Sequence, residues 1–318
     1  MTHNSYVLEN RFGIVLSGGD GTRLGDFVHR IRGDSLPKQY NNFTGKRSML
    51  EHTLHRAETL IQAQRLFVVI TRRHLKFDEV RRQIGSRPLG TVVIQPENKD
   101  TAPGVLLPLL YLSKQSPEAV LALFPSDHFI GEEDLFMCNV ERAFRVVESD
   151  RSRIVLLGTE PYEPDPEYGY IIPGEEFEHG SFDCTKRVEL FVEKPASQVA
   201  ARIIRAGALW NTLVMVFKLE TLLAAFQRRT PKLYRSFQAI AEVIGTPDEQ
   251  PVLERVYRTL EPINFSKALL QSLPYDDHQS LAVLPVPGVT WSDLGTPVRL
   301  SSALQQLSRS NHAECQRT

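Results

Sequence analysis

The sequence predicts an α/β fold in which a mixed, mostly parallel β-sheet is flanked by helices on both faces. Three observations support this prediction. Short apolar runs with the composition of β-strands recur between turn residues, amphipathic helical patterns separate them, and the two kinds of segment alternate along the first half of the chain. Such alternation is typical of a largely parallel sheet, whose ligand crevice forms from the loops at the carboxyl ends of the strands.

The first half contains five expected strands and two clear helical stripes. The strands are Phe12–Leu16, Leu66–Ile70, Thr91–Ile94, Val120–Phe124 and Ile154–Leu157. Apolar residues spaced three to four apart predict that each helix buries one face. These residues are Leu50, Leu54, Ala57 and Ile61 in the first helix, and Phe136, Val140, Phe144 and Val147 in the second.

Beyond Thr159 there is less helix between the strands, which predicts a mixed insertion. The expected strands are Tyr168–Ile172, Val188–Val192, Leu209–Phe217 and Leu281–Val286. The helical stretches are Leu219–Leu260, broken at Pro231 and around Thr246–Pro247, and a closing helix near Pro297–Leu307. No internal repeat is visible, so we expect one domain over residues 1–318, with an inserted substrate-binding half and a frayed tail at 308–318.

Composition excludes several classes of protein. The 318 residues carry 37 Lys plus Arg against 38 Asp plus Glu, and the formal net charge of −1 provides no basic field for nucleic acid or an anionic membrane. No apolar run approaches the roughly 20 residues that span a bilayer. Because Met1–Arg11 also lacks the apolar core of a secretory signal, we expect a soluble, cytoplasmic protein with neither nucleic acid nor membrane as a partner.

Cysteine and histidine spacing does not indicate a metal centre. The three cysteines, Cys138, Cys184 and Cys315, are odd in number and unpaired in spacing, so we expect neither a disulfide framework nor a zinc site. His52 and His55 share a helix face, but no nearby Cys or carboxylate completes a ligand set. A solvated helix face is the preferred interpretation of this pair.

A glycine-rich turn follows the first expected strand. It reads LSGGDGTRL at Leu16–Leu24, and LPKQY follows at Leu36–Tyr40. Its three glycines, Gly18, Gly19 and Gly21, allow positive φ angles and bring N–H groups close to an anion. Arg23 and Lys38 supply two charges that an ordinary glycine turn would not need. The turn lacks the endings of the Walker and dinucleotide loops, so a phosphate cradle of another type is the hypothesis.

The ordered set Gly-Gly-x-Gly-Thr-Arg-Leu followed by Pro-Lys-Gln resembles the signature of the sugar nucleotidyltransferases, which join a nucleoside triphosphate to a sugar 1-phosphate. Five further segments resemble, in order, the remaining motifs of the mannose-1-phosphate guanylyltransferases. They are QPENKDTAPG at Gln95–Gly104, FPSDH at Phe124–His128, EYGYI at Glu167–Ile171, FVEKP at Phe191–Pro195 and WSDLG at Trp291–Gly295. The resemblance covers roughly Gly13 to Leu300.

This resemblance implies a Rossmann-like fold of the nucleotide-diphospho-sugar transferase type, without a C-terminal β-helix or cupin domain. It implies a nucleotide-binding half at about residues 12–160 and a sugar-phosphate-binding half at about 161–300. The implied reaction joins GTP and mannose 1-phosphate into a nucleotide sugar by in-line attack on the α-phosphorus, and pyrophosphate leaves. Mg²⁺ is the implied cofactor, and a homodimer is the implied assembly.

By resemblance, the glycine-rich turn and the loop after the third strand bind the nucleotide. The residues implied are Leu16, Gly18, Gly19, Asp20, Gly21, Thr22, Gln95, Pro96 and Thr101. Arg23 is assigned to the β- and γ-phosphates that leave, and Lys38 to the attacking or α-phosphate. Thr101 lies near the start of an expected helix through Leu112, where free N–H groups would face a ligand. A capped helix without a ligand explains the same residue types equally well.

Two aspartates are the candidate magnesium ligands. Asp127 follows the strand Val120–Phe124 and should project into the crevice, and Asp293 lies in a turn before a helix. Paired carboxylates with phosphate oxygens and water suit Mg²⁺, and the family uses equivalents of both residues in this way. The alternative is helix capping, because Ser126/Asp127 and Ser292/Asp293 both precede possible helices.

The sugar-phosphate site is implied at the ends of later strands. Glu193 is assigned to sugar hydroxyls and Lys194 to the sugar phosphate, with a surface ion pair as the alternative for this doublet. Gly169 would let the backbone approach the hexose, and Asn211 would hydrogen-bond it. For the neighbouring Trp210, a role in the core is the preferred interpretation.

The chain departs from the guanylyltransferase pattern at several positions. Gly25-Asp26 stands where the family often has a proline, Thr212-Leu213 replaces Ser-Gly after Trp-Asn, and Asn264 lies where an aspartate is common. Thr212 and Leu213 are expected to reshape the sugar pocket. Two other functions therefore stay open: the same chemistry on glucose 1-phosphate with UTP or dTTP, and a sensor that binds a nucleotide sugar without catalysis.

Overall fold

The computed structural model describes residues 10–43, 45, 47–177, 184–276 and 280–305. The predicted tail at 308–318 and Cys315 lie outside these residues. Residues 297–305 are helical, as expected for the closing helix, and the last two positions of that expectation are also outside the described part.

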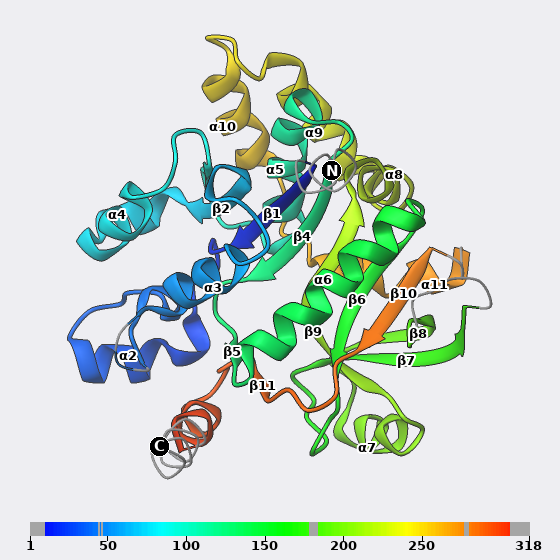
Figure 1. The fold of residues 1–318 in the computed structure, drawn as a ribbon. Coiled ribbons are helices and arrows are strands. Elements are labelled where there is room, and N and C mark those ends of the chain that lie inside the picture. The colour runs from blue at the N-terminus through cyan, green and yellow to red at the C-terminus, as the bar shows by residue number, and fades with distance from the viewer. Residues whose placement is uncertain (1–9, 44, 46, 178–183, 277–279, 306–318) are drawn as a thin grey trace.

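A nine-stranded sheet forms the centre of the molecule, in the order β3-β2-β1-β4-β9-β6-β10-β8-β7 (Figure 1). Strands β9 and β8 run antiparallel to their neighbours, and the remaining strands share one direction. The strands are β1 Arg11–Leu16, β2 Leu66–Thr71, β3 Val92–Gln95, β4 Val120–Pro125, β6 Ile154–Thr159, β7 Gly169–Glu176, β8 Lys186–Glu193, β9 Leu209–Lys218 and β10 Leu281–Pro285. The predicted mixed, mostly parallel sheet is therefore confirmed.

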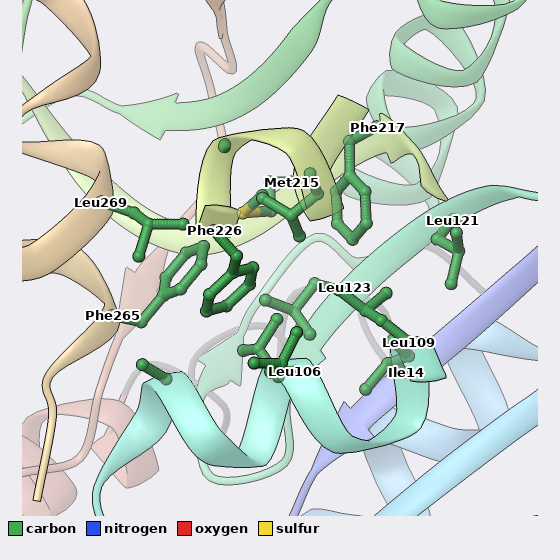
Figure 2. Packing of buried hydrophobic residues seen from close by; sticks show 14 of the residues in the cluster. Ile14, Leu106, Leu109, Leu121, Leu123, Met215, Phe217, Phe226, Phe265 and Leu269 are labelled. Carbon is green, nitrogen blue, oxygen red and sulfur yellow. The ribbon is translucent and has the colours of Figure 1, made fainter. Parts of the chain in front are cut away.

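Helices cover both faces of this sheet because its strands alternate their apolar side chains between two cores. Ile14 and Leu123 pack on one face with α5 Thr101–Gln115, α8 Leu219–Arg229, α9 Pro231–Val243 and α10 Glu249–Thr259. Val15 and Phe124 pack on the other face with α3 Met49–Ala57, α4 Asp78–Gly85, α6 Glu133–Ser149 and α7 Ser197–Arg205. Figure 2 shows the first core, where Leu106 and Leu109 of α5 meet Leu121 and Leu123 of β4.

Local sequence signals explain where the helices begin and end. Helix α3 starts with a capping box, in which the Ser48 hydroxyl accepts from the Glu51 N–H and the Glu51 carboxylate accepts from the Ser48 N–H. The expected stripe through Ile61 was too long, since α3 ends at Ala57 and Ile61 is buried beyond a turn. Pro231 starts α9, as the predicted break requires.

The remaining elements are short and connect the strands and longer helices. Helix α2 Gly25–Arg32 follows the glycine-rich turn, and α11 Leu273–Asp276 precedes β10. Short turns of 3-10 helix occur at Thr22–Leu24, Lys38–Tyr40, Ala63–Arg65 and Arg72–Lys76, and a π-helical turn occurs at Ser266–Leu270. No helix in the described ranges is both long and apolar enough to cross a membrane.

Candidate active site

A small second sheet brings the two candidate aspartates to one place. Strand β5 Phe129–Ile130 pairs antiparallel with β11 Trp291–Ser292, so that Ser292 lies opposite Phe129. Asp127 precedes β5 and Asp293 follows β11 directly. This pairing joins segments that are far apart in the sequence, and it carries both carboxylates to the carboxyl end of β4.

Lys38 links these two aspartates. Its Nζ lies 3.0 Å from Oδ2 of Asp127 and donates to the backbone oxygen of Asp293 at 2.5 Å. The lysine is buried, and it belongs to the short helical turn Lys38–Tyr40. Burial opposes the ionisation of Asp127, but Lys38 and His128 together outweigh this effect and lower the pKa of that carboxyl.

The Asp293 carboxylate is held from both sides. Arg23 Nη2 donates to Oδ2 at 3.0 Å, and Arg299 Nη1 donates to Oδ1 at 2.9 Å. Oδ1 also accepts from the Tyr168 hydroxyl at 3.2 Å and from the Gly295 N–H at 2.8 Å. Burial favours the neutral acid, yet the surrounding positive charges lower the pKa of Asp293 to about 2. The site therefore holds an ionised carboxylate.

The glycine-rich turn is anchored through its carbonyl groups. Thr71 Oγ1 donates to the Gly18 oxygen at 2.8 Å, and Gln39 Nε2 donates to the oxygens of Ser17 and Gly19 at 3.0 and 2.7 Å. The Tyr40 hydroxyl adds a bond to the Ser17 oxygen at 2.9 Å. Within the described part of the chain, the N–H groups of Gly18, Gly19 and Gly21 donate to no protein acceptor. These donors are therefore available to an anion.

Close approach and backbone angle explain two of these glycines. A Cβ at Gly18 would lie 2.7 Å from Nε2 of Gln95. Gly21 has a φ of 63°, and a Cβ there would lie 3.0 Å from the backbone nitrogen of Lys38. Only glycine permits both the close packing at position 18 and the left-handed conformation at position 21 without strain.

Asp20 introduces a negative charge into this turn, and nearby groups balance it. Its carboxylate forms an ion pair with Arg73, accepts from Asn98 Nδ2 at 2.9 Å and lies 3.3 Å from Nε2 of His74. These contacts turn the Asp20 side chain toward the segments that follow β2 and β3. The charge of Asp20 is thus compensated where a phosphate would otherwise be repelled.

Two cavities include most of the predicted nucleotide-site residues. A cavity of about 330 Å³ is lined by Leu16, Gly18, Gly19, Val69, Gln95, Asn98, Asp100, Thr101, Gly104 and Pro262. A smaller one of about 150 Å³ is lined by Gly21, Thr22, Arg23, Leu24, Lys38, Asp127 and Gly295. Pro96 lines neither cavity. The turn thus separates a largely uncharged space from a charged one.

Three of the four predicted sugar-phosphate residues lie together. Gly169 of β7 pairs with Glu193 of β8, and a Cβ at Gly169 would lie 2.7 Å from Glu193 Oε2 and 3.5 Å from Asn211 Cβ. Burial raises the pKa of Glu193. Lys194 is exposed just beyond β8 with a φ of 50°, and its N–H donates to the Tyr168 oxygen at 3.1 Å.

The structure shows the surroundings of three residues that depart from the family pattern. Thr212 does not shape the sugar pocket, contrary to expectation, because it is fully buried and its hydroxyl donates to the Leu157 oxygen at 2.7 Å. Leu213 has a φ of 59°, in the region that favours glycine. Asn264 Nδ2 lies 3.3 Å from the Asp100 carboxylate, which an aspartate at position 264 would repel. Trp210 is buried in the core, as predicted.

The alternative of helix capping fails for both aspartates. Asp127 precedes β5, and α6 begins only at Glu133. Asp293 closes a turn on the Gly295 N–H, while Thr296 accepts from the Arg299 N–H at 3.3 Å at the start of the closing helix. Both carboxylates are therefore free of a capping role.

The donor set suits a cation shared with substrate. The described residues contain no group of three or more His, Cys, Asp or Glu side chains that could hold a metal by themselves. Mg²⁺, however, is commonly bound by one or two carboxylates together with phosphate oxygens and water. Asp127, which is 32% exposed, and Asp293 are two carboxylates of the kind that such a site uses.

Sequence reasoning missed the residues that position this site. Arg299, Tyr168 and Tyr257 contact predicted site residues, but no motif interpretation assigned them such a role. Gln39 and Tyr40 were part of a recognised motif, and their contacts with the turn became visible only in the structure. Two signals were available: Arg299 comes shortly after Asp293 in the sequence, and Tyr168 lies within the EYGYI motif.

Comparison with solved structures gives the class of the fold. A structure described as a mannose-1-phosphate geranyltransferase from Thermus thermophilus superposes with a TM-score of 0.72 at 26% identity, over 90% of this chain and 76% of that one. A UDP-glucose pyrophosphorylase complexed with UDP-glucose, at 13% identity and a TM-score of 0.55, shares the fold alone. The fold is that of the nucleotide-diphospho-sugar transferases.

Sequence comparison then gives the family. The profile of the nucleotidyl transferase family matches residues 12–310, and the chain belongs to this family. It is 25% identical to a mannose-1-phosphate guanylyltransferase of Salmonella montevideo and 23% identical to one of Escherichia coli, over 89% of this chain in each case. The chain spans 58% and 59% of the length of those two relatives.

Proposed function

We propose that this chain transfers a nucleotidyl group from GTP to mannose 1-phosphate, and that it releases GDP-mannose and pyrophosphate. The motif order and the names of the guanylyltransferase relatives support these substrates. One observation carries the reaction type: Lys38 contacts both Asp127 and Asp293 beside the glycine-rich turn. A buried cation that contacts one carboxylate and the backbone of the second aspartate suits a reaction in which two phosphate groups must approach.

The proposed chemistry is an in-line displacement. An oxygen of the sugar phosphate forms a bond to the α-phosphorus, and the bond from that phosphorus to the bridging oxygen of the β-phosphate breaks. The pyrophosphate that leaves takes the electron pair. Catalysis of such a step consists mainly of positioning and charge neutralisation. Lys38 supplies a fixed positive charge at the point where the two phosphates meet.

Arg23 suits the leaving pyrophosphate. Its side chain is 46% exposed and pairs with Asp293 at 3.0 Å and with Glu167 at 3.3 Å. Guanidinium groups bind phosphate oxygens in two-point contacts, and a partly exposed one can exchange its carboxylates for phosphate at little cost. The Gly18–Thr22 N–H groups would hold the same phosphates.

The two ends of the ligands have separate places. The 330 Å³ cavity next to Gln95 and Thr101 would take the base, and Glu193 with Asn211 would hydrogen-bond the hexose near Gly169. Lys194 would neutralise the sugar phosphate. Asp127 and Asp293 would hold Mg²⁺, which neutralises phosphate charge when bound.

The test is a substrate matrix on the purified chain. Four nucleoside triphosphates, GTP, UTP and dTTP among them, are each combined with mannose, glucose and galactose 1-phosphates, with Mg²⁺ or with EDTA. Products are identified by mass spectrometry, and pyrophosphate release is measured in parallel. We expect GDP-mannose as the preferred product in the samples with Mg²⁺. If the chain prefers glucose 1-phosphate with UTP or dTTP, the proposed substrates are wrong but the proposed type of reaction still holds. If nucleotide sugars stabilise the protein against heat but no pair of substrates is turned over, the chain is a sensor and not an enzyme.

A further inference from the structure

The Gln95 amide lies between two glycines at the wall of the 330 Å³ cavity. A Cβ at Gly18 would be 2.7 Å from Gln95 Nε2, and one at Gly104 would be 3.5 Å from both Nε2 and Oε1. Gln95 ends β3 and is buried. The absence of side chains at positions 18 and 104 therefore makes room for this amide group.

Tyr257 of α10 contacts the amide from inside the protein. Its hydroxyl donates to Gln95 Oε1 at 3.1 Å, and both groups are buried. The Tyr257 ring packs against Phe237 with 5.8 Å between the ring centroids. Burial raises the pKa of Tyr257, so the hydroxyl keeps its proton. Tyr257 lies behind Gln95 and is not part of the cavity lining.

This contact determines which end of the amide faces the cavity. Among the described residues, Gln95 Oε1 is the one acceptor for the Tyr257 hydroxyl, and Gln95 Nε2 donates to none of them. If the amide were rotated by half a turn, its NH₂ group would donate to the Tyr257 oxygen, and the buried O–H proton would be left without an acceptor. An unpaired buried donor costs about 1–3 kcal/mol. The orientation with Nε2 toward the ligand is therefore strongly preferred.

We propose that Tyr257 is a positioning residue for base selection: by holding Gln95 Oε1, it makes the cavity present an N–H donor and favours bases with a carbonyl at the contacted edge. Guanine O6, uracil O4 and thymine O4 accept from such a donor. Adenine and cytosine carry an amino group at the equivalent place, and two donors then face each other without a bond. This inference rests on the proposed function, because it assumes that the cavity binds the base.

The test compares Tyr257→Phe with a matched control. Tyr111→Phe likewise removes one phenol hydroxyl from the helices on this face. Tyr111 is half-buried, and its hydroxyl donates to Glu249 Oε1 at 2.7 Å rather than to Gln95. For each protein, kcat/KM is measured with GTP, ITP and ATP, and with UTP and CTP. ITP keeps the 6-carbonyl of GTP but lacks its 2-amino group. Nucleotide-dependent thermal stabilisation is recorded in parallel as a readout of binding alone.

The parent and Tyr111→Phe should prefer GTP and ITP over ATP, and UTP over CTP. In Tyr257→Phe the amide is free to rotate, and we expect the ratio of kcat/KM for GTP over ATP to fall about ten- to a hundredfold. Most of the change should come from better use of ATP, which a general loss of folding would not produce. An unchanged ratio in Tyr257→Phe would overturn the inference, as would a parent that prefers ATP or CTP.

These outcomes separate the inference from the proposed function. If the parent turns over ATP or CTP in preference to the other nucleotides, the proposal of nucleotidyl transfer stands. The proposed role of Tyr257 is then wrong. Stabilisation by GTP and UTP but not by ATP and CTP, lost in Tyr257→Phe, supports the inference even if no pair of substrates is turned over. A parent that no nucleotide stabilises or turns over contradicts both.

Discussion

Arg299 Nη1 donates to Asp293 Oδ1 at 2.9 Å, on the oxygen opposite the one that Arg23 holds. The two arginines differ in environment: the Arg299 side chain is 12% exposed and the Arg23 side chain 46%. Arg299 also pairs with Asp165 and stacks over the Tyr168 ring, 4.4 Å from its centroid. Arg299 is therefore the fixed support of Asp293, and Arg23 is the group that can turn to a ligand.

Replacing Arg23 tests whether the exposed partner of Asp293 takes part in catalysis. In Arg23→Ala we expect kcat/KM to fall at least about a hundredfold, because the leaving phosphates lose a two-point cationic contact. Folding stability should change little, since Arg23 is 46% exposed and Arg299 still pairs with the buried Asp293 carboxylate. Arg30→Ala, on the exposed side of α2, is the control. Activity of Arg23→Ala within about twofold of the parent would remove Arg23 from the mechanism.

Replacing Arg299 tests the buried support. Arg299→Ala removes the charged partner of Asp293 Oδ1 and the ion pair of Asp165, so we expect kcat to fall about ten- to a hundredfold with little change in KM. Arg299→Lys should recover only part of this loss, because one ammonium cannot reproduce the planar fork that spans both carboxylates. Steady-state kinetics with urea unfolding would distinguish misplacement of Asp293 from general destabilisation. Equal kcat in all three proteins would contradict the positioning role.

The buried His74 makes stability depend on pH. Burial lowers its pKa to about 4, with Arg73 as a further cause, whereas the unfolded value is 6.5. The unfolded state therefore takes up a proton that the folded state refuses, and stability that is complete above pH 6.5 is lost as the pH falls toward 4. The loss is about 3 kcal/mol. Between about pH 7.5 and 4.5 we therefore expect the free energy of unfolding to fall less in His74→Gln than in the parent.

Urea unfolding at both pH values measures this difference. His55→Gln is the matched control, because it removes one histidine from an exposed position on α3. The parent and the control should show the same change in unfolding free energy. If His74→Gln shows that change too, His74 is not the group responsible.

Gly18 and Gly19 provide a matched pair within the turn. A Cβ at Gly18 meets Gln95 Nε2 at 2.7 Å and Thr71 Oγ1 at 3.2 Å, whereas a Cβ at Gly19 meets nothing within 4 Å. Gly18→Ala should lower the free energy of unfolding by about 1–3 kcal/mol because the added methyl group displaces the packed amide. Gly19→Ala should stay within about 0.5 kcal/mol of the parent. Chemical denaturation measures both, and equal stability of the two variants would refute this account of Gly18.

Local sequence patterns were sufficient for the nine strands of the central sheet but not for the short strands β5 and β11. The strands and helices follow hydrophobic periodicity, because each must bury one face or both against neighbours of the same sheet. The turn at Leu16–Leu24 was also predictable from local sequence, because only glycine tolerates its close contacts and left-handed backbone. The overlong stripe through Ile61 shows the limit: burial continued after the helix had ended.

The sequence by itself determined the fold class, the glycine-rich turn and the residue types available for phosphate chemistry, because periodicity, backbone freedom and charge are local properties. Only the tertiary structure decided which of these residues meet. The pairing of β5 with β11 brings Asp293 to Lys38 and Asp127, and α10 brings Tyr257 to Gln95. Thr212, expected in the sugar pocket, turned instead to the Leu157 oxygen. Such contacts join residues far apart in the chain, and they depend on how whole layers pack rather than on any local pattern.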